Sequence, residues 1–154
     1  MRVRGAAMFV ENLLADKDDQ IWSITPDATV YEALVQMDRK NIGALLVIQG
    51  GELIGILSER DYARKIIIKG KSSRETLVKE VMTTEVCYVG RKTRMEECLA
   101  IMSDKRIRHL PVMEDDQLIG LVSIGDVVKS IINEQEIVID HLYNYIHGVY
   151  YSPH

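Results

Sequence analysis

Two strings of sequence decide the fold, IGILSERD at Ile54–Asp61 and IGLVSIGD at Ile119–Asp126. The second begins 65 residues after the first, and each contains a glycine, a serine three residues later and an aspartate three residues after that. The same offset aligns Ile24–Ala63 with Val89–Val128 without a gap. This spacing indicates an internal duplication. Since one copy is too short to bury a core alone, we expect the two copies to pack together.

Each copy predicts the element order β-α-β-β-α. Apolar residues at helical spacing predict the first helix, and two apolar runs separated by a polar turn predict a pair of strands. We therefore expect an α/β or α+β fold of two pseudo-symmetric motifs packed as one module, with an additional C-terminal helix. The predicted helices are Val30–Lys40, Glu59–Lys69, Arg94–Lys105 and one from Ile124, and the predicted strands are WSI, ALLVI, LIGIL, VCYV, HLPVM and LIGLV.

The rest of the chain is assigned around the two copies. We predict a leading segment over 1–20, the first copy over 21–70, a linker with a short helix over 71–85, the second copy over 86–133 and a helical tail over 134–154. The leading segment is expected to introduce the first copy as the short helix introduces the second. The tail carries apolar residues at helical spacing, through Tyr145 and Ile146, so it predicts an extra helix that packs on the pair or on a second chain.

The composition excludes several classes of function. The formal net charge is −4, which disfavours a cationic face for duplex DNA, and no apolar run approaches the roughly 18 residues of a membrane span. We expect a cytoplasmic protein without a membrane partner. Cys87 and Cys98 are too far apart for a CxxC motif and are expected to be buried thiols. The sequence has no phosphate-binding loop and no histidine pair spaced for zinc, so we predict neither a catalytic nor a metal site.

The repeated serine and aspartate suggest a ligand chemistry. Ser58 and Ser123 stand where a strand ends and a helix begins, where unpaired N–H groups would attract a phosphate. Asp61 or Asp126 could accept both hydroxyls of a ribose diol. The alternative is a capping box that binds nothing, because S-x-x-D also satisfies helix donors. The duplication and the preceding glycines, which would keep side chains out of the adjoining groove, favour the ligand.

These strings, together with RIRHLPV at Arg106–Val112 and the duplication, resemble a stand-alone pair of cystathionine-beta-synthase (CBS) domains, also called a Bateman module. The resemblance covers about Val10–Ile132 and implies two clefts that hold an adenine nucleotide such as AMP, ATP or NAD. It implies a regulatory module without catalysis, a homodimer and an unidentified regulated protein. The ligand-binding residues that it implies are Ile24, Ile42, Gly43, Ala44, Ser58, Arg60 and Asp61, and Val89, Ile107, Arg108, His109, Ser123 and Asp126.

The charges near the two implied clefts differ. Arg60, Arg108 and His109 would surround an anion beside Asp61, whereas the matching positions beside Asp126 are Gly125, Gly43 and Ala44. We therefore expect tighter phosphate binding beside Asp61. The alternative function is a dimeric adaptor, in which the pair is structural and the tail contacts a partner protein.

Overall fold

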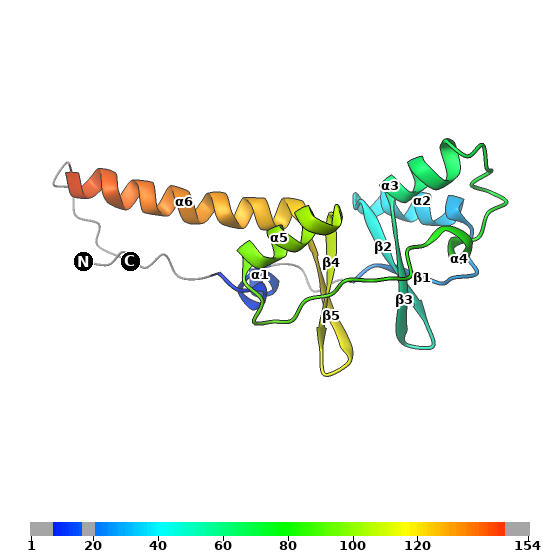
Figure 1. The fold of residues 1–154 in the computed structure, drawn as a ribbon, viewed down its shortest axis with the longest axis horizontal. Helices are drawn as coiled ribbons and strands as arrows, with labels where there is room; N and C mark the ends of the chain where they lie inside the picture. The colour runs from blue at the N-terminus through cyan, green and yellow to red at the C-terminus, as the bar shows by residue number, and fades with distance from the viewer. Residues whose placement is uncertain (1–7, 17–20, 147–154) are drawn as a thin grey trace. The chain divides into compact units, whose positions relative to one another are not determined.

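The computed structural model describes residues 8–16 and 21–146. Within them the chain divides into two compact units, one of residues 21–88 and the other of residues 8–16 with 89–146. Each unit contains one copy of the duplicated pattern, drawn in Figure 1. The mixture of helices and small sheets confirms the predicted α+β class.

The elements of the 21–88 unit are β1 (Ser23–Ile24), α2 (Val30–Lys40), β2 (Ala44–Gln49), β3 (Glu52–Ser58), α3 (Glu59–Tyr62), the π-helix η1 (Ala63–Ile67) and α4 (Val78–Val81). The sheet order is β1-β2-β3, with β1 parallel and β3 antiparallel to β2. Gly50 and Gly51 form the turn between β2 and β3 with φ of 58° and 81°, values that favour glycine. Figure 1 shows α2 and α3 at the end of this hairpin opposite to its turn.

The core of this unit lies between α2 and the sheet. Val30, Ala33 and Met37, the predicted apolar stripe of α2, are buried against residues of β2, β3 and α4. Thr29 begins α2 with a capping box, since its hydroxyl accepts from Glu32 N at 3.1 Å and Glu32 Oε2 accepts from Thr29 N at 2.8 Å. The helix therefore has both the local start signal and the buried face that its sequence predicts.

The other unit repeats the arrangement with one strand fewer. Its elements are α1 (Val10–Asp16), α5 (Met95–Lys105), β4 (His109–Glu114), β5 (Gln117–Ser123) and α6 (Ile124–Ile146), and β4 pairs antiparallel with β5. The predicted strand VCYV is wrong, because only an isolated bridge between Val89 and Val112 forms. In the first copy Leu46 N donates to Trp22 O at 3.4 Å, but Pro111 occupies the equivalent position and has no N–H to donate.

The short helices α1 and α4 each pack on a copy that is not the one following them in the sequence. Val10 N donates to Thr93 O at 2.8 Å, so α1 belongs with the second copy, and the expected role of this segment at the first copy is wrong. In the same way Val78 N donates to Ala28 O at 2.8 Å, which ties α4 to the first copy. The two helices are therefore equivalent elements of the two units.

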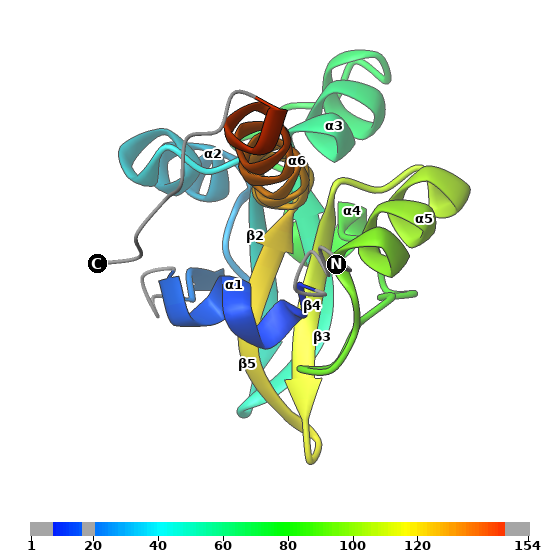
Figure 2. The same cartoon turned by 90° about the vertical axis from the view of Figure 1, so that its left-hand side faces the viewer.

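The helices at the ends of the copies also differ from the prediction. The helix expected over Glu59–Lys69 is the short α3 followed by the π-helix η1. The second copy and the tail share one continuous helix, α6, instead of two, and Figure 2 looks along it nearly end-on. Among residues 8–16 and 21–146, no helix combines the length and the apolar character that crossing a membrane requires. For Tyr145 and Ile146 of the predicted tail the structure describes only the helical backbone, and residues 147–154 of that tail lie outside the described residues.

Candidate functional site

Ser58 and Asp61 form a capping box at the start of α3. The Ser58 hydroxyl accepts from Asp61 N at 3.1 Å, and Asp61 Oδ2 accepts from Ser58 N at 3.0 Å and from the Ser58 hydroxyl at 3.1 Å. Ser123 and Asp126 repeat the two backbone bonds at the start of α6, at 3.1 Å and 3.0 Å. The geometry that the capping alternative predicts is therefore present in both copies, and the ligand role stays a prediction.

The sequence predicted unpaired backbone N–H groups at the start of α3, but three of these groups are hydrogen-bonded. Glu59 N donates to Gly43 O at 3.0 Å, and the N–H groups of Ser58 and Asp61 are used by the capping box. The second copy matches, because Ile124 N donates to Arg108 O at 2.8 Å. A phosphate near these positions would therefore depend on cationic side chains more than on the backbone.

The two glycines have a packing role that the sequence analysis did not foresee. A Cβ added to Gly55 would lie 2.7 Å from Met82 Sδ and 3.0 Å from the Thr83 carbonyl oxygen, and one added to Gly120 would lie 2.6 Å from Leu14 Cδ2. The space where a groove was expected is thus filled beside Gly55 by the residues that follow α4, and beside Gly120 by α1. The absent side chains permit close packing within each unit.

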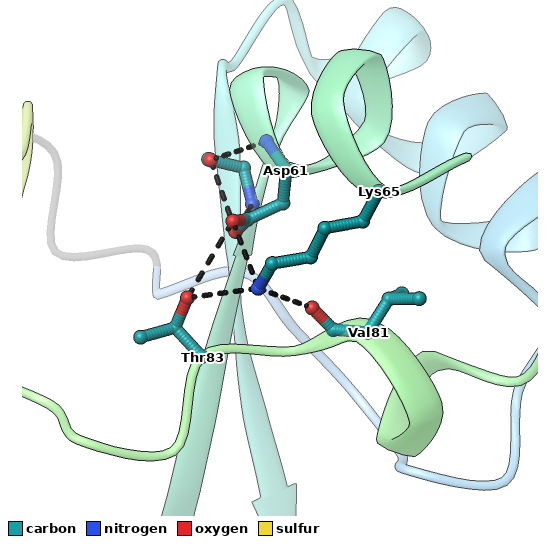
Figure 3. Close-up of polar contacts among 5 residues, drawn as sticks. Asp61, Lys65, Val81 and Thr83 are labelled. Atoms are coloured by element: carbon teal, nitrogen blue, oxygen red, sulfur yellow. Dashed lines mark hydrogen bonds and ion pairs between the residues drawn. The ribbon is translucent and has the colours of Figure 1, made fainter. Parts of the chain in front are cut away.

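Lys65 joins the first site, as Figure 3 shows. Its Nζ lies 3.2 Å from Asp61 Oδ1, donates to Val81 O at 2.8 Å and lies 3.4 Å from Thr83 Oγ1. Thr83 Oγ1 lies 3.5 Å from Asp61 Oδ1. Sequence reasoning missed both residues. The spacing of Asp61 and Lys65, four residues apart on a helix, could have indicated the ion pair, whereas Thr83 had no local signal.

Of the other predicted site residues, Gly43, Ala44 and His109 lie at the strand ends that hold Ser58 and Ser123, whereas Ile24 and Val89 pair three residues further along β2 and β4. In the first copy Ala44 pairs with Ser58, Gly43 bonds to the residue after Ser58, and Ile24 pairs with Val47 of the same sheet. In the second copy His109 of β4 pairs with Ser123 of β5, and Val89 forms an isolated bridge with Val112. Ile42 and Arg108 are immediate chain neighbours of Gly43 and His109, Arg60 follows the residue after Ser58, and Ile107 precedes Arg108. The expectation that Arg108 and His109 approach Asp61 involves both units and stays a prediction.

The cysteines are not equivalent. Cys98 is fully buried on α5, and burial, with a smaller contribution from Glu97, raises the pKa of its thiol from 9.0 to about 11. Cys87 is partly exposed, so the expectation that both thiols are buried is wrong for Cys87. The described part of the chain contains no group of three or more His, Cys, Asp or Glu side chains arranged to hold a metal ion.

Comparison with curated proteins finds close relatives. The chain is 44% identical over 135 residues to the mitochondrial CBS domain-containing protein CBSX3 of Arabidopsis thaliana, covering 84% of this chain. It spans 65% of the length of that relative.

Solved structures give the same fold. A protein with CBS domains from Burkholderia ambifaria MC40-6 is 45% identical, with a TM-score of 0.81 over 83% of this chain and 96% of that one. The CBS domain pair of protein MJ0100, solved with 5′-methylthioadenosine and S-adenosyl-L-methionine, is 22% identical with a TM-score of 0.74 over 83% of this chain and 98% of its own. The family model of the CBS domain matches residues 15–68 and 78–133. The chain therefore belongs to the CBS domain family, as a pair of CBS domains.

Proposed function

We propose that the chain is a regulatory module that binds an adenine nucleotide such as AMP, ATP or NAD, without turning it over. CBS pair proteins are regulatory, and the pair of MJ0100 holds two ligands that contain adenosine. The observation that carries the proposal is the recurrence, in both units, of a serine and an aspartate at the end of the second hairpin strand. Because a carboxylate can accept two hydroxyls at once, Asp61 and Asp126 are the groups proposed to hold the ribose.

The proposal extends to the predicted site residues and to the phosphate. Arg60, Arg108 and His109 supply the positive charge for a phosphate beside Asp61, so this site is proposed to bind phosphate more tightly than the site beside Asp126. A ligand that contacts both domains stabilises the arrangement that it binds best, which is how occupancy would be reported to a regulated protein. We place the module in the cytoplasm, although its Arabidopsis relative is named as mitochondrial.

Titration calorimetry with AMP, ATP and NAD tests this proposal. We expect at least one of them to bind, Asp61→Ala to remove binding at the first site, and Asp126→Ala to have the smaller effect on phosphate ligands. Each substitution also removes a helix cap, so Glu32→Ala, which breaks the capping box of α2 away from the site, is the matched control. Glu32→Ala should lose stability and keep binding.

Three results would overturn the proposal. These are the absence of binding by all three nucleotides, affinity retained in both aspartate variants, and chromatographic evidence that the protein converts a bound nucleotide.

A dimeric adaptor is the second candidate, favoured by the surface of α6. Ile132, Ile137, Ile139, Leu142 and Tyr143 are 50–61% exposed on this helix. Exposed apolar residues concentrated on one helix are typical of a protein contact. Sedimentation of Ile139→Glu should then show a lighter species than the native chain, while Ile68→Glu, 74% exposed in the other unit, should not. Unchanged mass for Ile139→Glu would remove the support for this candidate.

A further inference from the structure

We propose that Lys65 makes the first site selective for anionic nucleotides over neutral nucleosides, because its ammonium forms an ion pair with the Asp61 carboxylate when no ligand is bound. The inference rests on the proposed function and concerns a side chain that neither the duplicated motif nor the predicted site includes.

Both oxygens of the Asp61 carboxylate already have partners. Its two oxygens offer about four lone-pair directions. Oδ2 accepts from the N–H and the hydroxyl of Ser58, and Oδ1 faces the Lys65 ammonium at 3.2 Å and the Thr83 hydroxyl at 3.5 Å. A ribose diol that binds through Asp61 must therefore compete with these partners. The contacts of Oδ1 are longer than those of Oδ2, and the contacts of Oδ2 cap the start of α3. We therefore expect the ribose hydroxyls to replace the partners of Oδ1.

Lys65 can release Asp61 and remain hydrogen-bonded. Its Nζ donates to Val81 O at 2.8 Å, which is shorter than its distance to the carboxylate, and it lies within reach of Thr83 Oγ1. What the ammonium loses is its negatively charged partner. A ligand phosphate replaces that charge, whereas a neutral nucleoside takes the carboxylate and offers no anion in return. The net cost of displacing Lys65 is therefore larger for the nucleoside.

The second copy lacks this side chain. Ser130 stands 65 residues after Lys65, is buried, and donates its hydroxyl to the backbone carbonyl of Asp126 at 2.9 Å. The π-helix of Ala63–Ile67, which includes Lys65, is likewise confined to the first copy, since α6 continues as an α-helix. The proposed role of Lys65 is therefore specific to the site at Asp61.

The test compares AMP with adenosine, which share the diol and differ in the phosphate. Affinities are measured by calorimetry, with adenosine also followed by displacement of bound AMP, in the Asp126→Ala background that leaves only the first site. In Lys65→Met we expect adenosine to bind roughly two- to fivefold more tightly, the range of a half-exposed ion pair. AMP should gain less, so that the affinity ratio of AMP to adenosine falls.

Three variants control the experiment. Lys79→Met removes one positive charge from the same unit, where Lys79 pairs with the exposed Asp27, and should leave the ratio unchanged. Thr83→Val removes the uncharged donor on Oδ1 and should also preserve the ratio, and Lys65→Arg should retain it by keeping the charge. Melting temperatures confirm that each variant is folded.

The outcomes separate this inference from the proposed function. If the native chain binds none of the nucleotides, the proposed function fails. If AMP binds but Lys65→Met leaves the affinity for adenosine unchanged or raises both affinities equally, the role of Lys65 alone is overturned. A fall in the ratio in Lys79→Met as large as that in Lys65→Met would also overturn it, because net charge would then explain the effect.

Discussion

Replacing Gly55 by alanine should destabilise the 21–88 unit, and the equivalent change at Gly120 should cost much less in the other unit. Neither glycine has a positive φ, so the backbone accepts alanine at both positions. The difference lies in what the new methyl group meets. At Gly55 it meets a backbone oxygen of Thr83 at 3.0 Å as well as Met82 Sδ at 2.7 Å, whereas at Gly120 the three nearest atoms all belong to the side chain of Leu14.

The magnitude follows from what can move. The Thr83 carbonyl is held by the bridge with Ile56, in which Ile56 N donates to Thr83 O at 3.0 Å and Thr83 N to Ile56 O at 2.9 Å. Forcing a methyl group into a packed site costs about 1–3 kcal/mol, and we expect about 2–3 kcal/mol at Gly55. At Gly120 the end of Leu14 can rotate away, so we expect about 1 kcal/mol or less. A loss of 2 kcal/mol in a unit of this size lowers the melting temperature by roughly 10 °C.

Trp22 makes the measurement specific to one unit. It is the single tryptophan of the sequence and packs against the core of residues 21–88, so its fluorescence follows the unfolding of that unit. We expect Gly55→Ala to shift the Trp22 transition to lower temperature and Gly120→Ala to leave it in place. Circular dichroism at 222 nm records the helices of both units in the same samples. An unmoved Trp22 transition in Gly55→Ala, or a larger loss of stability in Gly120→Ala, would refute the packing argument.

Three further predictions follow from single residues. A thiol reagent should modify Cys87 in the native protein and Cys98 only after unfolding, and rapid reaction of both thiols in the native state would contradict the burial of Cys98. Because burial raises the pKa of Cys98 from 9.0 to about 11, the folded chain holds a proton that the unfolded chain releases, so this stabilisation is complete below pH 9 and is lost as the pH rises to 11. Urea unfolding should record a loss of roughly 2–3 kcal/mol over this range that is absent in Cys98→Ala. Thr29→Ala should lower the stability of the 21–88 unit by about 1 kcal/mol through the lost cap of α2, and an unchanged urea midpoint would argue against that cap.

The sequence predicted those elements whose signals are local. The buried stripe of α2 and the hairpins β2–β3 and β4–β5 follow from apolar periodicity and turn residues, and they appear close to the predicted bounds. The strand at VCYV failed because its pairing depends on a distant residue, Pro111, whose missing N–H ends the ladder. The π-helix at Ala63–Ile67 and the continuity of α6 leave no local pattern that separates them from ordinary helices.

The candidate site shows the same division. Ser58, Asp61, Ser123 and Asp126 were found from their repeated spacing, and each forms the capping bonds that this spacing allows. Their charged surroundings were harder to foresee, since Lys65 contacts Val81 and Thr83 from a different part of the chain. The packing around the glycines was missed for the same reason, because Leu14 is remote in sequence from Gly120 and Met82 is remote from Gly55.

The position of α1 has a consequence for the order of synthesis. All the described residues of the 21–88 unit are contiguous, so the partners for the contacts within this unit are all made before Val89 is added. Val10 is translated earlier but bonds to Thr93, roughly 80 residues later. The helix α1 is therefore made before its partners and completes its contacts only after the whole 21–88 unit has been synthesised.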